Sequence, residues 1–228
     1  MSCLYMALLR HVAITLGHHG DFMKTISFMS QKGGSGKTTL SVHLAVAAEE
    51  VGEKVFIVDT DIQKSATTWG EARNQESPIV ATVAAIDIQR VLDAGRHDAM
   101  TLAIIDTAPH AAPDASKIAA ISDLVVIPCR PAAFDLAAMG NAVEIVRATQ
   151  ARAVFVLSAC PFRAPEIAET REILASYEDI PVAPVEITDR RAFARAVATG
   201  RAVTEFESDG KAAFEIRELF NWIQEQLL

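Results

Sequence analysis

Cysteines and long apolar runs are scarce in this chain of 228 residues, and each scarcity excludes a class of protein. The three cysteines, Cys3, Cys129 and Cys160, are too few and too widely spaced for a disulfide framework or a zinc site. No apolar run approaches the roughly 18 residues that a membrane-spanning helix requires. We therefore expect a protein of the reducing cytoplasm that has no membrane span.

Basic residues are in the minority, because 21 lysines and arginines face 29 aspartates and glutamates, for a formal net charge of −8. An acidic chain can bind nucleic acid only through a local basic patch. Arg190, Arg191, Arg195 and Arg201 form such a cluster on or beside one expected helix, and Lys211 is a further candidate. From the residues alone, the cluster fits a DNA-binding surface and a solvated helix face equally well.

Hydrophobic residues are plentiful, at 50% of the chain, although only 6% of the residues are aromatic. Short β-branched runs alternate with helical segments, which predicts a single α/β domain with a mostly parallel, twisted sheet and helices on both faces. We expect the last two helices at about residues 190–199 and 211–227. The expected strands are 25–29, 55–58, 79–83, 102–105, 124–127, 153–157 and 182–187.

The first 22 residues do not fit this alternation. They contain Arg10 and a few apolar residues, but they lack the charged start, apolar core and cleavage site of a signal peptide. Met23 opens a segment that is a plausible domain start. We interpret residues 1–22 as an N-terminal extension or as sequence upstream of the true start, and residues 23–228 as the folded domain.

A glycine-rich segment follows the first expected strand and opens a helix, which is the context of a phosphate-binding P-loop. Glycines let the backbone wrap around phosphates, and the helix N-terminus favours an anion. We predict that Lys37 contacts the β- and γ-phosphates and that the Thr38 hydroxyl binds Mg²⁺. The expected nucleotide-binding residues are Lys32, Gly33, Gly34, Ser35, Gly36, Lys37, Thr38 and Thr39.

Three aspartates, Asp59, Asp61 and Asp106, lie where buried strands are expected to end. Ligands of open α/β sheets bind at the carboxyl ends of the strands, so these carboxylates should face the phosphate loop. Asp106 fits a ligand of Mg²⁺, held directly or through water. Such residues also cap helices and turns. The upstream phosphate loop favours a functional role for Asp61 and Asp106, whereas the two interpretations of Asp59 are balanced.

The segment Lys32–Thr39 resembles the deviant Walker A motif of the ParA/MinD family of P-loop ATPases, in which glutamine often precedes the first lysine, as Gln31 does here. The resemblance implies that Lys32 reaches across a dimer interface to the partner's nucleotide. The segment 58–63 resembles the family's Asp-x-Asp-Pro-Gln motif, with Ile62 in place of proline. It implies that Asp61 orients the attacking water, beside the catalytic lysines, and that Asp59 supports the Mg²⁺ shell.

Weaker similarity extends to the C-terminus, where residues 124–131 and 190–203 resemble small, ParF-like plasmid partition proteins. The resemblance implies an ATPase that uses ATP and Mg²⁺, forms a homodimer on ATP binding and then binds double-stranded DNA without sequence preference. Hydrolysis to ADP and phosphate, weak until a centromere-binding ParB-like adaptor stimulates it, would reset the cycle of plasmid or chromosome segregation. The protein would be cytoplasmic, and on the nucleoid when ATP-bound. The base would lie near residues 185–189.

Two alternatives use a similar phosphate loop. One is a P-loop metabolic enzyme, an ATP-dependent ligase or amidase that activates a small carboxylate substrate. The other is a MinD-like ATPase that positions itself on a membrane through a basic amphipathic C-terminal helix. The last expected helix carries Glu215, Glu218 and Glu225 against Arg217, which disfavours anionic lipid, so we expect it to pack on the domain.

Overall fold

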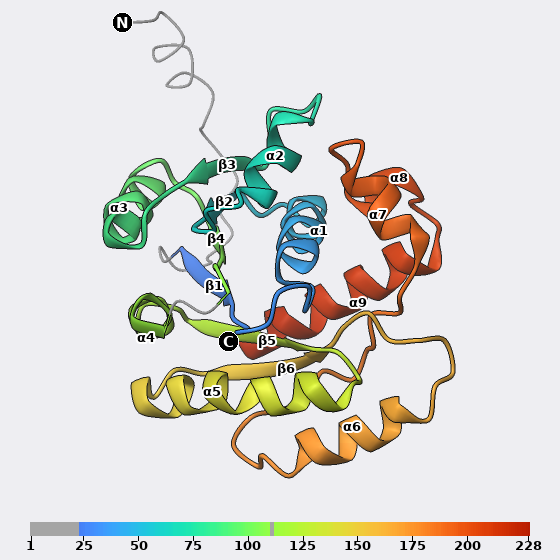
Figure 1. Cartoon of the computed structure of the whole chain (residues 1–228). Helices are drawn as coiled ribbons and strands as arrows, with labels where there is room; N and C mark the ends of the chain where they lie inside the picture. The colour runs from blue at the N-terminus through green and yellow to red at the C-terminus, as the bar shows by residue number, and fades with distance from the viewer. Residues whose placement is uncertain (1–22, 110–111) are drawn as a thin grey trace, which may run out of the picture.

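A computed structural model describes residues 23–109 and 112–228, which form a sheet covered by helices on both faces (Figure 1). The sheet has six strands in the order β3-β2-β4-β1-β5-β6, and every neighbouring pair is parallel. The predicted fold class is therefore confirmed. The extension interpreted at residues 1–22 lies outside the described residues. The strands are β1 Lys24–Phe28, β2 Val55–Asp59, β3 Ile79–Thr82, β4 Leu102–Asp106, β5 Leu124–Cys129 and β6 Ala153–Leu157.

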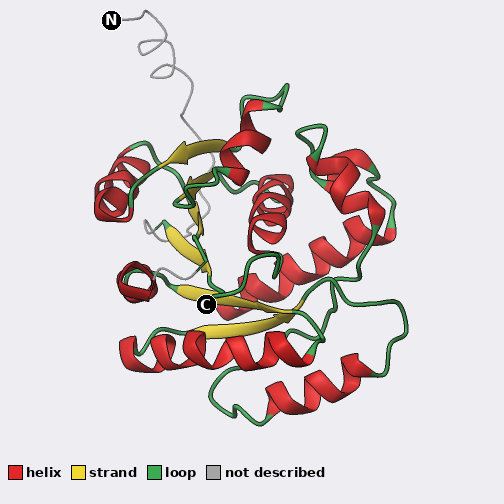
Figure 2. Ribbon diagram, viewed as in Figure 1, coloured by secondary structure: helices red, strands yellow, loops and turns green. Residues whose placement is uncertain are grey.

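Helices connect these strands and cover both faces of the sheet (Figure 2). Within the described ranges, no helix is long and apolar enough to cross a membrane. The helices are α1 Lys37–Glu50, α2 Ser65–Glu71, the 3₁₀ turn η3 Ala85–Asp87, α3 Ile88–His97, α4 Ala112–Ala120, α5 Ala133–Thr149, α6 Glu166–Ala175, α7 Arg191–Val197, α8 Val203–Phe206 and α9 Lys211–Gln226.

All strands except the exposed edge strand β3 are buried on both faces, and successive residues of each point to opposite sides of the sheet. In β2, Val55 and Ile57 join the core under α1 and α9, whereas Phe56 and Val58 join a core under α3. A third cluster fills the space between the β5–β6 half of the sheet and α5. This alternation explains the continuous β-branched runs of the sequence, which have no polar face.

The C-terminal helix α9 packs on the domain, as expected. Its apolar residues Ile216, Leu219, Phe220 and Ile223 are buried in the core that α1 also enters. The side that a MinD-like membrane helix would offer to lipid is therefore already covered by protein. This packing removes the structural basis for the membrane-positioning alternative as far as α9 is concerned.

The last expected strand, 182–187, is not a strand in the structure, and this prediction was wrong. Isolated bridges are the only ladder pairs that the described chain forms there. Pro181 and Pro184 lack an N–H group, so a continuous ladder cannot form along this segment. The segment nevertheless follows β6, because the N–H of Ile187 donates to the carbonyl of Leu157 over 2.9 Å. It ends at the carboxyl edge of the sheet.

Candidate nucleotide-binding site

The glycine-rich loop joins the end of β1 to the start of α1 and depends on two glycines with a left-handed backbone. Gly34 has φ = 76° and Gly36 has φ = 100°, values that residues with a side chain rarely adopt. A Cβ atom at Gly36 would also lie 3.3 Å from the Oγ of Ser158. Glycine is therefore required at Gly36 by both its backbone conformation and its neighbour.

Two buried serines lie in or beneath the loop, and one of them fixes its backbone. The Oγ of Ser158, just after β6, donates to the carbonyl of Ser35 over 2.6 Å. The hydroxyl of Ser35 itself is buried, yet it has no hydrogen-bond partner in the described part of the chain. Sequence analysis missed Ser158, although its place directly after an expected strand was a signal.

Lys37 places a buried cation across the mouth of the loop. It is the first residue of α1, and its Nζ donates to the carbonyl of Lys32 over 3.3 Å. Burial lowers the pKa of Lys37, and the negative charges of Asp106 and Asp61 oppose that shift. The side chain therefore lies between the loop and the carboxylates, where a phosphate would meet it. Lys32, which starts the loop, is half-buried.

Thr38 and Asp106 form the pair that fits a magnesium ion. The hydroxyl of Thr38 donates to the Oδ2 of Asp106 over 2.6 Å, and the Asp106 side chain is fully buried at the end of β4. Burial raises the pKa of Asp106 to about 7, further raised by Asp59 and Asp61 and opposed by Thr38 and Lys37.

The rest of a magnesium shell would have to come from outside the protein. Among the residues that the structure describes, no three or more His, Cys, Asp or Glu side chains form a group that could hold a metal ion. Mg²⁺ usually keeps waters and binds through one or two protein oxygens together with substrate phosphates. A hydroxyl and one carboxylate beside a phosphate loop match that pattern.

Asp59 and Asp61 lie beside this pair but are arranged differently. Asp59 aligns with Asp106 on the adjacent strand. Its Oδ1 accepts the N–H of Asp61 at 3.1 Å, and its Oδ2 accepts the N–H and the hydroxyl of Thr67 at 2.9 Å each. Asp59 thus holds the loop that carries Asp61, and its place in a magnesium shell stays a prediction. Asp61 lies close enough to Lys37 to influence the pKa of its ammonium group.

A cleft of about 270 Å³ opens beside the phosphate loop. Its walls include Gly34 and Thr39 from the loop region and the segment 187–190, which overlaps the region predicted for the base. Arg130, which follows β5, also lines it and donates to the carbonyl of Gly34 over 3.4 Å. Sequence analysis did not single out Arg130, because only the fold brings the end of β5 next to the loop.

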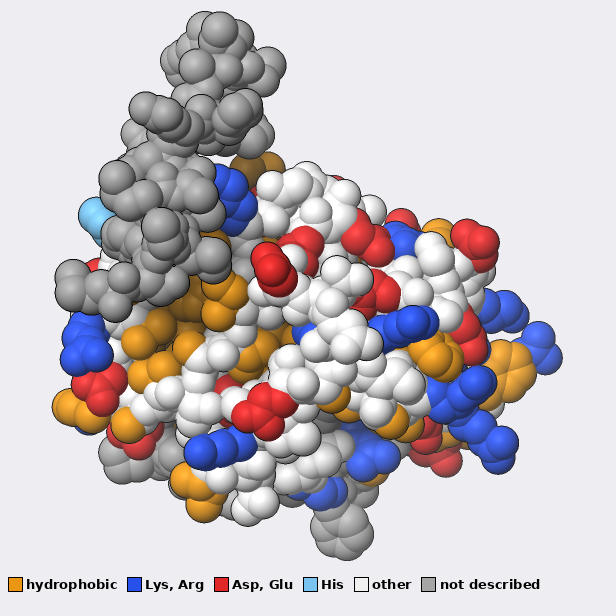
Figure 3. Space-filling view, turned by 90° about the horizontal axis from the view of Figure 1, so that it is seen from above, with side chains coloured by type: hydrophobic (Ala, Val, Ile, Leu, Met, Phe, Trp, Pro, Cys, Tyr) orange, Lys and Arg blue, Asp and Glu red, His pale blue; other side chains and the backbone are white. Residues whose placement is uncertain are grey.

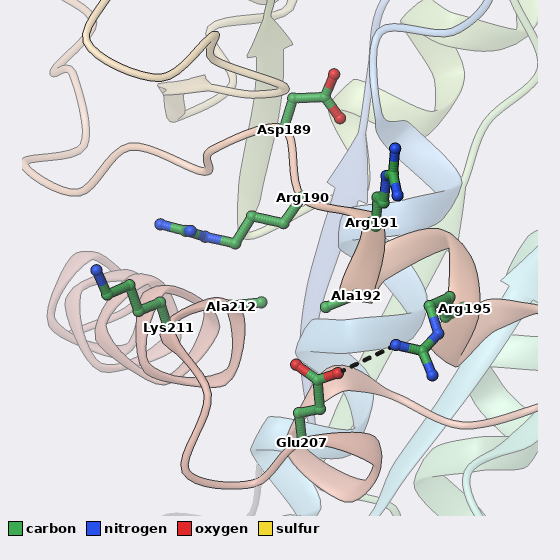
Figure 4. Close-up of a pocket in the computed structure, with 8 residues that line it drawn as sticks. All are labelled: Asp189, Arg190, Arg191, Ala192, Arg195, Glu207, Lys211 and Ala212. Atoms are coloured by element: carbon green, nitrogen blue, oxygen red, sulfur yellow. Dashed lines mark ion pairs between the residues drawn. The ribbon is translucent and has the colours of Figure 1, made fainter.

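A second, shallower groove of about 480 Å³ lies between α7 and the start of α9 (Figure 4). Lysine and arginine side chains gather on the right-hand side of the molecule in Figure 3, the side of α7 and α8 in Figure 1, and they alternate there with carboxylates. The groove has four cationic residues against two acidic ones. Its charged lining residues are Arg190, Arg191, Arg195, Lys211, Asp189 and Glu207.

The structure separates the four arginines predicted to bind DNA. Arg190 extends over α9 (Figure 4) and forms a two-pronged ion pair with Glu215, with nitrogen–oxygen distances of 2.6 and 3.1 Å. Arg191 turns away from α9, and Arg195 lies 3.7 Å from Glu207. Arg201 is exposed on the turn after α7, outside the residues that line the groove. Arg190 is therefore neutralised by protein at a largely buried site, Arg195 is paired with Glu207 on the surface, and Arg191 is exposed to solvent.

This arrangement of loop, aspartates and helices has recognisable relatives. Residues 26–203 match the family described as the CobQ/CobB/MinD/ParA nucleotide binding domain. The match spans more than half of the chain. It includes the phosphate loop, the three aspartates and α7.

Individual proteins show similarity over different lengths. The chain is 28% identical over 218 residues to a maintenance of carboxysome distribution protein A from Gloeobacter kilaueensis, covering 93% of this chain and 97% of that protein. It is 29% identical over 125 residues to a protein ParA from Rhizobium radiobacter, covering 54% of this chain and 56% of that protein. The structure of apo McdA from Cyanthece shares the fold, with a TM-score of 0.70 and 16% identity over 91% of this chain and 100% of that chain.

Proposed function

Because the chain belongs to the CobQ/CobB/MinD/ParA family of nucleotide-binding domains, we propose that it is a cytoplasmic ATPase of the ParA type. It dimerises when it binds ATP, associates with DNA of the nucleoid as a dimer and is reset by hydrolysis. The observation that carries the ATPase proposal is the hydroxyl–carboxylate pair of Thr38 and Asp106, 2.6 Å apart, directly beside the buried Lys37. These are the groups that hold Mg²⁺ and phosphates in P-loop enzymes.

Each residue of the site has a distinct task in the proposed reaction. The loop N–H groups, the hydroxyl of Ser35 and Lys37 hold the phosphates. Thr38 and Asp106 would hold Mg²⁺, which would supply positive charge to the phosphates of the nucleotide. Asp61, on a loop that Asp59 fixes through its backbone N–H, orients the attacking water.

Lys32 supplies the dimer requirement in this proposal. It belongs to the same loop as Lys37, whose ammonium group donates to the backbone carbonyl of Lys32 over 3.3 Å. A cation donated by the partner subunit stabilises charge on the transferring phosphoryl group, as an arginine finger does. ATP drives dimerisation only if it binds the dimer more tightly than the monomer.

DNA binding is proposed for the groove between α7 and α9. Arg191, Arg195 and Lys211 present positive charge there, which would track backbone phosphates and give salt-dependent affinity without sequence preference. Two subunits joined at their nucleotides would combine two such grooves into a longer surface.

The proposed cargo is a plasmid or chromosome, linked through a ParB-like adaptor that stimulates hydrolysis. The relative named for carboxysome distribution matches this chain over 97% of its own length, which makes such a compartment the second candidate cargo. The family name also covers CobQ and CobB, so a small-substrate enzyme stays the alternative in another class. Such an enzyme would turn over ATP only with its acceptor and would not need Lys32.

Analytical ultracentrifugation with a non-hydrolysable ATP analogue, with ADP and without nucleotide tests the proposal. We expect the wild-type chain to dimerise with the analogue alone. Lys32→Ala should bind the analogue as a monomer, and Lys54→Ala, at the opposite end of β2, should behave as wild type. A Lys32→Ala protein that dimerises and hydrolyses ATP normally would contradict the proposed mechanism.

A further inference from the structure

Helix α2 begins at the nucleotide site. Its residue Thr67 donates both its backbone N–H and its hydroxyl to the Oδ2 of Asp59, at 2.9 Å each. The other oxygen of Asp59 accepts the N–H of Asp61. One fully buried carboxylate therefore ties the start of α2 to the loop that carries the proposed water-orienting residue. A shift of that loop would move α2 with it.

The far end of α2 is fastened to the C-terminal helices by two side chains, which we call the Trp69–Arg73 clamp. The indole N–H of Trp69 donates to the carbonyl of Arg201 over 3.1 Å. Arg73 donates to the carbonyl of Gly200 at 2.9 Å and forms a two-pronged ion pair with Glu205 at 2.9 and 3.1 Å. Its guanidinium stacks over the Trp69 ring, 4.6 Å from the centroid, and its side chain is only 2% exposed.

The segment held by the clamp is the turn that ends α7. Gly200 has φ = 66°, and a Cβ atom there would lie 2.4 Å from the backbone of Ala72, so the turn is pressed directly against the end of α2. The N–H of Gly200 donates to the carbonyl of Val197, the last residue of α7, over 3.0 Å. The clamp thus fixes one end of the helix whose Arg191 and Arg195 line the cationic groove.

The P-loop helix α1, which lies next to α2, also supports this unit (Figure 1). The N–H of Val203, at the start of α8, donates to the Nδ1 of His43 over 3.1 Å, and the Phe193 ring of α7 packs edge-on against His43 with centroids 5.1 Å apart. Burial lowers the pKa of His43 to about 3, so the imidazole is a neutral acceptor. Helices α7 and α8 therefore rest on two elements that both start at the nucleotide site.

We infer that Arg73 is a positioning residue that couples the Asp59–Asp61 loop to the cationic groove through α2 and the turn Gly200–Glu205. The inference deepens the proposed function, because it assigns the connection between the ATP site and the DNA surface. Packed interiors transmit displacements instead of absorbing them, and a buried two-pronged ion pair fixes direction as well as distance. Because α2 joins the clamp to the Asp59–Asp61 loop, ligands at the ATP site and at the groove both act on the position of this helix.

The test measures how strongly the ATP analogue increases DNA affinity, in wild type and in Arg73→Gln and Trp69→Phe. For wild type, we expect the DNA affinity with the analogue to exceed the DNA affinity without it by a factor of about 5 to 150. Both variants should bind the analogue within about twofold of wild type, while the ratio falls at least about fivefold. Trp69→Phe keeps an aromatic ring under Arg73 but removes the indole N–H together with part of the ring system, and it serves if Arg73→Gln folds poorly. If both variants bind the analogue as wild type does and also keep the wild-type ratio of DNA affinities, the inference is overturned.

Arg147→Gln is a control for the loss of an arginine ion pair, at a more exposed site than that of Arg73. Arg147 also forms a two-pronged pair, with Asp179 at 2.6 and 2.8 Å, and also lies over an aromatic ring, that of Tyr177 at 5.5 Å, but it belongs to α5 and is remote from the clamp. Its loss should leave the ratio unchanged. An equal fall of the ratio in Arg147→Gln would mean that any lost arginine pair has this effect, and the assignment to Arg73 would fail.

Hydrogen exchange separates failure of this inference from failure of the proposed function. If wild type binds no DNA in any state, the DNA proposal fails, but amides of residues 197–206 can still be followed on adding the ATP analogue. A change of exchange there in wild type that is lost in Arg73→Gln supports the coupling. An unchanged rate in wild type, or a change that persists in Arg73→Gln, overturns it.

Discussion

The nucleotide site and the cationic groove are built in opposite ways. The nucleotide site takes residues from the ends of β1, β2, β4, β5 and β6 and fixes them by burial and hydrogen bonds. The groove takes residues from α7, the start of α9 and the segments beside them, and two of its arginines face a carboxylate, Arg190 with Glu215 and Arg195 with Glu207. Chemistry at the nucleotide site therefore depends on where each side chain is held, whereas binding at the groove depends on which of its charges the protein itself neutralises.

The largest expected effect lies at the nucleotide site. Lys37→Ala removes the buried cation that faces the phosphates, so ATP hydrolysis should fall by roughly a hundredfold or more. Nucleotide affinity, measured by titration with a fluorescent analogue, should fall with it. Lys54→Ala removes an exposed lysine at the other edge of the sheet and should change neither quantity. Equal effects of the two substitutions would mean that the loss of any lysine charge lowers hydrolysis, and the specific role of Lys37 would be contradicted.

The second effect concerns pH at the same site. The pKa of Asp106 is raised to about 7 by burial, so below that pH the carboxyl group is protonated and a proton must leave before Mg²⁺ binds. The affinity for Mg²⁺ in the presence of nucleotide should therefore fall about tenfold for each pH unit below about 7 and level off above it. Asp106→Asn should bind Mg²⁺ weakly and keep only the shallower dependence that the nucleotide's own phosphates cause. The same steep dependence in Asp106→Asn would contradict the assignment.

The third effect separates charges within the groove. Replacing Arg191 and Lys211 with glutamine should lower DNA affinity about tenfold or more and reduce its logarithmic salt slope by about two for each subunit. Arg190→Gln should hardly change the slope, because Glu215 already neutralises Arg190. It should instead lower the free energy of unfolding by about 1 to 3 kcal/mol, measured by urea denaturation. If Arg190→Gln strongly reduces the salt slope of DNA affinity, then an arginine that is ion-paired within the protein also contacts DNA, and the expected difference between the groove arginines is contradicted.

The contrast between the two regions also decides what the sequence can predict. The phosphate loop is contiguous, so its motif identifies Gly36, Lys37 and Thr38 without a fold, and the strand ends then bring Asp106 to it. The confirmed parallel sheet follows from β-branched runs that alternate with helices. These features depend on local pattern and on a general rule of α/β topology.

The missed features all depend on contacts between distant segments. Ser158 and Arg130 reach the loop only because β6 and β5 end beside it. The charge of Arg190 is neutralised by an ion pair with Glu215, 25 residues away. The strand expected at 182–187 was wrong because the apolar pattern was given more weight than the prolines that interrupt the ladder. The Asp59–Thr67 bond was missed for a similar reason, since a strand-end carboxylate can either bind a metal or cap the next helix.

The measurement that tests the account most directly is binding of the full chain to a random-sequence duplex with an ATP analogue, with ADP and without nucleotide, at two salt concentrations. We predict tight binding with the ATP analogue alone, weakened by the higher salt and by the loss of Arg191 and Lys211. Equal affinity in all three nucleotide states, or no binding in any, would contradict a nucleotide-switched DNA surface. The second result would favour a small-substrate enzyme built on the same phosphate loop.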